Sequence, residues 1–377
     1  MPASSHRDSF CDKSHLPQVA ALKRVFELWM LDRDFHDAYL ADPVHALEGT
    51  GLEVDQHAVS LLLLGGAREA RGSDPLAELP ETYVWYRDYV TERYRRNHVE
   101  RAGNLPDDPR FRDWTLRQLR RCEREMGVRG RFITHIPLAF ELTSGCSVGC
   151  SFCALSAGRL KGVFRHTGEN VTLWRDVLAR LHRTVGDAAG RGLCYYATEP
   201  LDNLDYELFL RDFFDEFGRI PQTTTAAATR SVERTRRLLR WGQETYEHFD
   251  RISVLGRHEL DAIVAAFSPE ELVFTDLLPQ FAEAPACNLT KAGRNRGEDQ
   301  ESGGTIACVS GFVVNMWEHS VRLVTPVPAS DQHPTGEQVY ERASFTDGAS
   351  LEKAVFGMID RHMHETIGLF DVLGAGR

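Results

Sequence analysis

The chain has 377 residues, of which 42% are hydrophobic, and its 44 basic and 55 acidic side chains give a formal net charge of −11. This apolar content suffices for a sizeable core, while the acidic balance disfavours a general binding surface for nucleic acid or an anionic membrane. No apolar run approaches the roughly 20 residues that span a bilayer, and residues 1–16 form a polar stretch without a signal region. We therefore expect a soluble, cytoplasmic protein that binds neither nucleic acid nor membrane.

Helical periodicity dominates residues 1–128, which are expected to form an N-terminal helical domain. Apolar side chains recur at helical spacing over residues 19–43, 81–101 and 108–127. The first of these stretches ends at an Asp-Pro pair, which is a common helix boundary.

From Arg131 the pattern changes to short β-rich runs that are separated by helical stretches. The expected strands lie at residues 132–143, 193–199, 221–229, 250–256 and 271–280. Strands that alternate with helices indicate βαβ units and a parallel sheet, either curled into a barrel or doubly wound. The functional side chains of such folds lie at the C-terminal ends of the strands.

The last third of the chain contains a segment without periodicity. Residues 283–304 are rich in Gly, Asn and charged side chains, so we expect a mobile loop that either closes over a ligand or is simply solvated. Residues 305–330 favour two more strands or a hairpin. We therefore assign residues 129–340 to an α/β domain and residues 341–377 to a C-terminal helical segment.

Three of the eight cysteines, Cys146, Cys150 and Cys153, lie within eight residues directly after the first expected strand. So few cysteines in so long a chain do not form a disulfide framework, and a tight group of thiols points to a metal or to catalysis. Structural zinc requires four ligands, usually as two separated pairs, and the remaining cysteines are isolated in the sequence. Three close thiolates suit a four-iron cluster with one open iron, with zinc and accidental proximity as the alternatives.

The C-x3-C-x2-C spacing, with the aromatic Phe152 directly before its last cysteine, resembles the signature of the radical S-adenosylmethionine (SAM) enzymes. This resemblance implies a partial (β/α)6 barrel that follows the N-terminal helical domain. It also implies that Cys146, Cys150 and Cys153 hold a [4Fe–4S] cluster whose open iron binds SAM near Phe152. One electron, from a donor such as flavodoxin or ferredoxin, then cleaves SAM to methionine and a 5′-deoxyadenosyl radical, which abstracts a hydrogen atom.

The resemblance further implies contacts to SAM from the second and fourth strands. In the family, the second strand ends in a turn similar to Gly-Gly-Glu-Pro that meets the SAM amino group. Here the turn contains Thr198 and Glu199 before a proline, and Ala197 and Thr198 replace the two glycines. Ser253 falls on the fourth expected strand, where it either reaches the SAM ribose or is an ordinary strand hydroxyl.

Longer blocks, at residues 195–207, 218–230, 305–331 and 343–351, resemble the radical SAM peptide epimerases of the polytheonamide type. The resemblance covers roughly residues 19–355. It implies that the protein converts L-residues to D-residues in a ribosomally made precursor peptide. The Cα hydrogen is removed from one face, and a cysteine thiol returns a hydrogen atom to the opposite face. The chain departs from the family at Val327, where relatives often carry a cysteine.

The hydrogen-donating thiol must come from outside the cysteine cluster, and the candidates are Cys194, Cys287 and Cys308. Cys194 precedes the second-strand motif and suits a buried apolar position, while Cys287 lies in the expected mobile loop. Cys308 lies on an expected strand within one of the family-like blocks. We therefore expect Cys308 to be the donor, the alternative being a buried core cysteine.

Two alternatives to epimerisation stay open. The same radical chemistry would serve a crosslink or a desaturation in a peptide, and the chain would otherwise be a non-catalytic, metal-containing partner that binds peptides. Residues 26–55 are similar to the leader sequences of nitrile-hydratase-like and Nif11-like precursor peptides. The helical domain is therefore expected either to dock the substrate leader or to serve as a helical cap.

Overall fold

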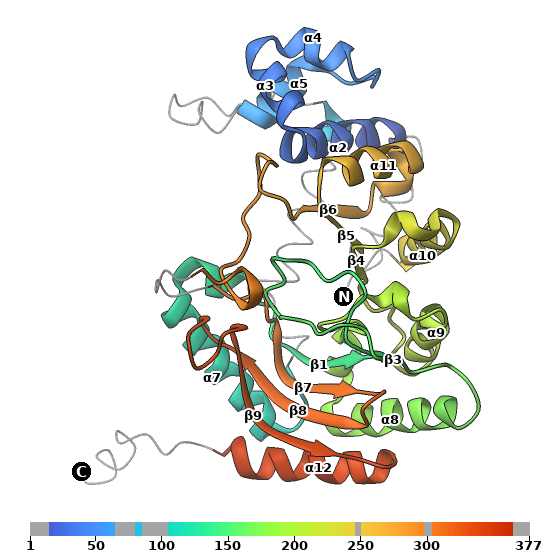
Figure 1. Ribbon diagram of the computed structural model, residues 1–377, viewed down its shortest axis with the longest axis vertical. Coiled ribbons are helices and arrows are strands. Elements are labelled where there is room, and N and C mark those ends of the chain that lie inside the picture. The colour runs from blue at the N-terminus through green and yellow to red at the C-terminus, as the bar shows by residue number, and fades with distance from the viewer. Residues whose placement is uncertain (1–14, 65–79, 85–104, 246–249, 298–303, 365–377) are drawn as a thin grey trace. The chain divides into compact units, whose positions relative to one another are not determined.

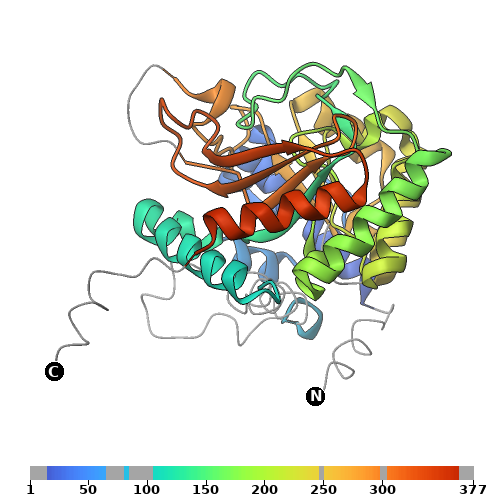
Figure 2. The same cartoon turned by 90° about the horizontal axis from the view of Figure 1, so that it is seen from below.

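The computed structural model describes residues 15–64, 80–84, 105–245, 250–297 and 304–364 (Figures 1 and 2). The chain divides into two compact units. The first unit comprises residues 1–96 and 225–289, and the second comprises residues 97–224 and 290–377. Within the described parts of the chain, no helix is both long enough and apolar enough to cross a bilayer.

Over residues 15–64, the first unit contains the helices α2 (Leu16–Leu31), α3 (Arg33–Ala41), α4 (Pro43–Glu48) and α5 (Gln56–Leu64). The helix expected over residues 19–43 is broken at Asp32, whose carboxylate accepts hydrogen bonds from two backbone N–H groups at the start of α3. Asp42 caps α4 in the same way. Most of the helix expected over residues 81–101 lies outside the described residues.

The first unit also contains a small α/β segment, made of β4 (Thr224–Thr225), η9 (Ala228–Ser231), α10 (Val232–Thr245), β5 (Asp250–Val254), α11 (Arg257–Ala266), η10 (Glu270–Leu272) and β6 (Thr275–Pro279). The sheet order is β4-β5-β6, and β5 and β6 are parallel. Lys23 of α2 donates a hydrogen bond to the Thr275 carbonyl at 2.6 Å, and Arg24 donates one to the Phe267 carbonyl at 3.2 Å. The N-terminal helices therefore belong with this sheet in one compact unit, and a separate helical domain of residues 1–128 stays a prediction.

The helical elements of the second unit are α7 (Pro109–Met126), η6 (Gly127–Phe132), α8 (Glu169–Val185), η7 (Asp187–Arg191), η8 (Pro200–Asp202), α9 (Tyr206–Phe217), η11 (Gly293–Asn295) and α12 (Gly348–His362). Its strands are β1 (Ile136–Glu141), β2 (Thr143–Ser144), β3 (Gly162–Val163), β7 (Val309–Asn315), β8 (Ser320–Pro326) and β9 (Glu337–Ser344).

A four-stranded sheet of order β1-β7-β8-β9 forms the centre of the second unit. β1 and β7 are parallel, while β8 is antiparallel to both of its neighbours. The mixed α/β class expected from the sequence is therefore confirmed. A partial (β/α)6 barrel stays a prediction, because its expected strands are divided between the two units.

One face of this sheet packs against helices, as Figure 2 shows for α12 and α8. On this face, Phe140 meets Trp174 of α8 with ring centroids 4.7 Å apart, and Phe312 meets Phe111 of α7 at 5.4 Å. Such edge-to-face aromatic pairs typically contribute about 0.5–1.5 kcal/mol beyond the burial of their area. The helices thus leave the opposite face of the sheet to form the floor of the cavity described below.

A β-bulge in β9 decides which of its side chains reach the cavity face. Leu323 pairs with Glu341 and Val324 pairs with Val339, so Tyr340 is an extra residue. As a result, Arg342 shares the cavity face with Val339, whereas strict alternation would have placed Glu341 there. Glu341 instead forms an ion pair with Arg361 of α12 at 2.6 Å.

Candidate active site

The three clustered cysteines lie in a loop, residues 145–161, that we call the cysteine loop. It joins β2 to β3, which pair with each other in antiparallel fashion. The Cys146 N–H donates to the Gly158 carbonyl at 2.9 Å, so the loop closes back on itself. Gly145 has a φ of +83°, and a Cβ there would overlap the Arg159 carbonyl. Only glycine fits that position.

The thiols of the cysteine loop are close neighbours. All three are partly buried. Burial raises the pKa of the Cys150 thiol, and the neighbouring thiols of Cys146 and Cys153 raise it further. Burial also raises the pKa of Cys146, while the backbone N–H groups of Val148 and Gly149 donate hydrogen bonds to its sulfur and oppose that rise. Three thiols and two N–H donors therefore converge on one region.

This donor set fits an iron–sulfur cluster better than a single ion. Within the described residues, no group of three or more His, Cys, Asp or Glu side chains is arranged around one metal position. Zinc would need every donor at about 2.0–2.3 Å from one point, whereas each thiolate of a cluster binds a different iron. N–H groups directed at a ligating sulfur are also a common means of tuning a cluster's reduction potential.

The turn after the second expected strand lies beside the cysteine loop. Backbone hydrogen bonds join the residues that precede this turn to β1. The Phe140 N–H donates to the Leu193 carbonyl at 2.7 Å, and the Tyr196 N–H donates to the Phe140 carbonyl at 3.1 Å. Ala197, which stands where the family has a glycine, adopts a left-handed φ of +52°. That conformation costs a non-glycine residue about 1–2 kcal/mol. The backbone of the turn thus keeps a glycine-like conformation although the glycine is absent.

The acidic half of the turn holds the cysteine loop in place. Asp202 accepts a hydrogen bond from the Ser147 N–H at 2.8 Å and a second from the Ser147 hydroxyl. Glu199 is 2% exposed, and its carboxylate accepts from the Leu201 N–H at 3.0 Å. Both acids lie near enough to Cys146 to raise the pKa of its thiol, after the larger effect of burial. The sequence analysis identified Glu199 but not Asp202, although both residues lie in the same family-like block, residues 195–207.

A second attachment holds the far end of the cysteine loop. The Arg294 N–H donates to the Cys153 carbonyl at 3.0 Å, and its guanidinium donates to the Ala157 carbonyl at 3.0 Å. Gly293 has a φ of +55°, and a Cβ there would overlap the Ala154 carbonyl. Residues 283–304 were expected to form a mobile loop, and within this segment Arg294 is joined to the cysteine loop by these two hydrogen bonds. Of the remainder, residues 298–303 lie outside the described chain.

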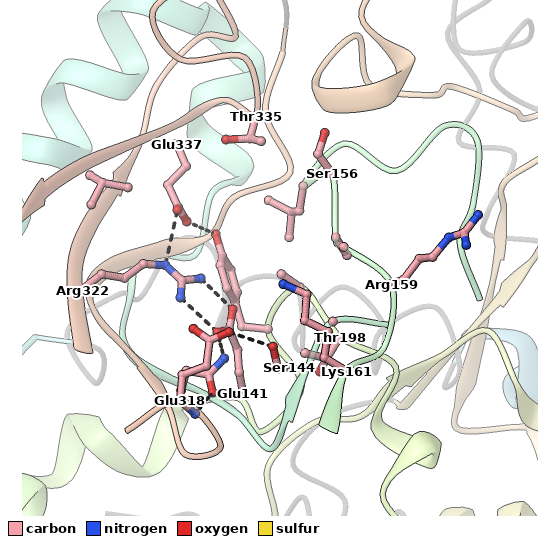
Figure 3. A pocket seen from close by; sticks show the side chains of 18 of the residues that line it. Glu141, Ser144, Ser156, Arg159, Lys161, Thr198, Glu318, Arg322, Thr335 and Glu337 are labelled. Carbon is pink, nitrogen blue, oxygen red and sulfur yellow. Dashed lines mark hydrogen bonds and ion pairs between the residues drawn. The ribbon is translucent and has the colours of Figure 1, made fainter. Parts of the chain in front are cut away.

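A cavity of about 340 Å³ opens between the cysteine loop, the turn and the sheet of the second unit (Figure 3). The cysteine loop contributes Ser156 and Arg159, the turn contributes Thr198, and the sheet contributes Glu141, Arg322 and Glu337. These elements are the C-terminal ends of β1 and β7 and the strands beside them. The cavity therefore lies where α/β folds place their chemistry.

Arg322 organises the floor of this cavity (Figure 3). Its guanidinium donates to both carboxylate oxygens of Glu141, at 2.6 and 3.0 Å, and lies 3.7 Å from Glu337. The other oxygen of Glu337 accepts a hydrogen bond from the Tyr196 hydroxyl. Burial lowers the pKa of Arg322, but Glu141 more than offsets this and holds it above its usual value. Burial raises the pKa of Glu337, and the charge of Arg322 opposes that rise.

Cys308 lies directly before β7 and beneath the cavity. Its carbonyl accepts from the Ile136 N–H at 2.9 Å. Its side chain packs against an apolar cluster on the cavity face that includes Tyr196 and also touches Leu155 of the cysteine loop. Tyr196 lines the cavity, whereas Cys308 is not among the described residues that do so.

The other candidate cysteines are placed less favourably. Cys194 is 1% exposed, and burial raises the pKa of its thiol well above its usual value. Cys287 belongs to the first unit, where it packs against the core. Phe152 is partly buried within the cysteine loop. Ser253 lies on β5 of the first unit opposite Leu278, so its contact with SAM stays a prediction.

Comparisons with known proteins give a relative of uncharacterised function. No family model matches the chain. The uncharacterised protein y4wI of Sinorhizobium fredii (strain NBRC 101917 / NGR234) is 39% identical over 306 residues, which are 76% of this chain. The chain spans 60% of the length of that relative. The crystal structure of BtrN in complex with AdoMet and 2-DOIA aligns with 61% of this chain and 82% of its own, at 14% identity and a TM-score of 0.39. Similarity at this level establishes neither a shared fold nor a shared activity.

Proposed function

We propose that this protein is a radical SAM enzyme that epimerises L-residues to D-residues in a ribosomally made precursor peptide. The observation that carries the proposal is the cysteine loop itself. Its three thiols lie together, Asp202 fixes it to the turn that contains Thr198 and Glu199, and a cavity opens beside both. The sequence resemblance to peptide epimerases supplies the reaction, and the structure supplies a site that accommodates it.

The residues that would hold the cofactors follow from this arrangement. Cys146, Cys150 and Cys153 would hold a [4Fe–4S] cluster, and Thr198 and Glu199 would meet SAM. When bound, the cluster and SAM supply a 5′-deoxyadenosyl radical that removes the Cα hydrogen of an L-residue. Electrons would come from a small donor protein such as flavodoxin or ferredoxin.

The chain's own residues would select the peptide and return the hydrogen. The cavity, of about 340 Å³, is at the lower end of the usual range for small-ligand sites, so it suits one residue of an extended peptide beside part of SAM. Glu141 and Arg322 form an ion pair on the cavity floor. Their charges therefore neutralise each other near the place where the peptide radical would form. Cys308 packs against the apolar cluster that includes the cavity residue Tyr196, and this supports Cys308 as the source of the returned hydrogen.

Chiral amino-acid analysis tests this proposal. The cognate precursor peptide would be incubated anaerobically with reconstituted enzyme, SAM and a reductant, and then hydrolysed. New D-residues would support epimerisation. An unchanged set of L-residues together with a loss of two hydrogens in mass would instead identify a crosslink or a desaturation. No SAM cleavage at all, in a protein that binds the peptide, would identify a non-catalytic partner.

A further inference from the structure

We propose that the hydrogen atom reaches the peptide through the hydroxyl of Tyr196, with Cys308 as the second donor behind it. This inference rests on the proposed function and deepens it by identifying the residue that touches the peptide radical. Three features of the second unit point to Tyr196: its contact with both the cavity and the cluster of Cys308, the strand pairing that joins the segments of Cys308 and Glu337, and its hydrogen bond to Glu337.

The first feature is that Tyr196 contacts both the cavity and the apolar cluster against which Cys308 packs. Its side chain lines the cavity next to Thr198. It also belongs to the apolar cluster against which Cys308 packs. Cys308 also lies close enough to Tyr196 to raise the pKa of its hydroxyl, after the larger effects of burial and of Glu337. A hydrogen atom from Cys308 would therefore meet Tyr196 before it reached the cavity.

The second feature is strand pairing, which brings the segment of Cys308 and the segment of Glu337 into one sheet. Val324 pairs with Gly311 on one side and with Val339 on the other. β7, which begins at Val309, and β9, which begins at Glu337, therefore lie on either side of β8. Cys308 directly precedes Val309, and Glu337 accepts the hydrogen bond of the Tyr196 hydroxyl.

The third feature is the partner of the hydroxyl. Glu337 is buried, and burial raises its pKa. Its carboxylate accepts the hydrogen bond of the phenol and so fixes the position of the phenol oxygen beside the cavity. Arg322 lies with its guanidinium carbon 5.7 Å from the Tyr196 ring centroid and restrains the ring. Glu337 and Arg322 are thus positioning residues, and Tyr196 is the catalytic residue.

The transfer balances in two steps and a reset. The peptide Cα radical takes the hydrogen atom of Tyr196, forming a C–H bond, breaking the O–H bond and leaving a neutral phenoxyl radical. The phenoxyl radical takes the hydrogen atom of the Cys308 S–H, restoring the tyrosine and leaving a thiyl radical. One electron from the low-potential donor protein and one proton from water then restore the thiol.

Two substitutions separate this relay from direct donation by Cys308, in anaerobic reactions in D₂O followed by electron paramagnetic resonance and peptide mass. For Cys308→Ala, the relay predicts a single deuterium transfer per enzyme and a tyrosyl radical whose hyperfine pattern changes with ring-deuterated tyrosine. For Tyr196→Phe, it predicts SAM cleavage with a peptide-centred radical and no D-residue. Tyr195→Phe is the matched control, because that hydroxyl bonds to Gln222 and Thr224 outside the cavity lining, and it should retain wild-type activity.

Other results would overturn the relay. Formation of D-residues by Tyr196→Phe at the wild-type rate would show that its hydroxyl is not on the path. A Cys308→Ala protein that cleaves SAM without a tyrosyl signal would identify direct donation by the thiol. Absence of SAM cleavage or of deuterium gain in the wild-type enzyme would instead refute the proposed function, and the relay with it. A Glu337→Gln protein keeps an amide oxygen that accepts the hydrogen bond of the phenol, so it should retain the relay, and loss of D-residues in this variant would contradict a positioning role.

Discussion

The carboxylate of Asp202 holds both the backbone N–H and the hydroxyl of Ser147, with the N–H at 2.8 Å. Ser147 directly follows Cys146, and Asp202 lies three positions after Glu199. This one pair therefore fixes the loop expected to bind the cluster against the turn expected to bind SAM. The position of the cluster relative to SAM would depend on this contact between Ser147 and Asp202.

Asp202→Ala should weaken cluster binding more than it weakens the fold. Hydrogen bonds to a charged acceptor typically contribute about 1.5–3 kcal/mol, and each 1.4 kcal/mol is about tenfold in affinity. We expect iron and sulfide per chain after reconstitution to fall by about tenfold at limiting iron. Asp360→Asn, at a carboxylate that is 61% exposed on α12, is the surface control and should load like wild type. Cluster loading in Asp202→Ala equal to that of wild type would show that Asp202 is not needed to hold the cysteine loop in place.

Gly293→Ala should disrupt the second attachment of the cysteine loop. A Cβ at this position would overlap the Ala154 carbonyl, and the φ of +55° is unfavourable for alanine. We expect a loss of roughly 1–3 kcal/mol in the free energy of unfolding, measured by denaturant titration. Gly256→Ala is the matched control, since a Cβ there meets no atom within 4 Å. A loss no larger than that of the control would show that the loop accommodates the extra methyl group.

The pair of Glu141 and Arg322 should be essential to the stability of the second unit. Their side chains are 7% and 13% exposed, and removal of one partner of a buried pair typically costs about 3–5 kcal/mol. We therefore expect Arg322→Met to lower the melting temperature strongly. Arg361→Met, which breaks a pair whose arginine is 56% exposed, should lower the melting temperature far less, because solvent screens an exposed ion pair. Similar losses in the two variants would mean that solvent reaches the first pair.

Glu337 and Glu341 should affect the pH dependence of stability with opposite signs. Burial raises the pKa of Glu337, so the folded protein binds this proton more tightly and the contribution is lost as pH rises above about 4.3. Arg361 lowers the pKa of Glu341, so its contribution is lost as pH falls through the same region. The stability of wild type minus that of Glu337→Gln should therefore decline with increasing pH, while the difference for Glu341→Gln should rise. If both stability differences rose with pH, or both fell, the opposite pKa shifts of Glu337 and Glu341 would be contradicted.

Local patterns in the sequence predicted several parts of the site. The cysteines follow the first strand of the second unit, and the acidic turn follows the segment beside β1, as the alternation of strands and helices indicated. Each of these features depends on residues close together in the chain, so periodicity and turn chemistry could predict them.

Features that depend on long-range pairing could not be read from the sequence. The bulge at Tyr340 turns Arg342 into the cavity, but it is defined only by the pairing of β9 with β8. The bonds of Lys23 and Arg24 to carbonyls near β6 place α2 in the same unit as that strand, more than 240 positions further along the chain. The attachment of Arg294 to the cysteine loop likewise joins segments 141 positions apart, since its partner is the carbonyl of Cys153.

The mass of the precursor peptide after reaction in D₂O tests the central claim most directly. The account predicts a gain of one deuterium at the Cα of each inverted residue, because the returning hydrogen comes from groups that exchange with solvent. Cys150→Ala should abolish the gain together with SAM cleavage. A peptide that loses two hydrogens and gains no deuterium would contradict epimerisation, and it would leave only the assignment of the cysteine loop in place.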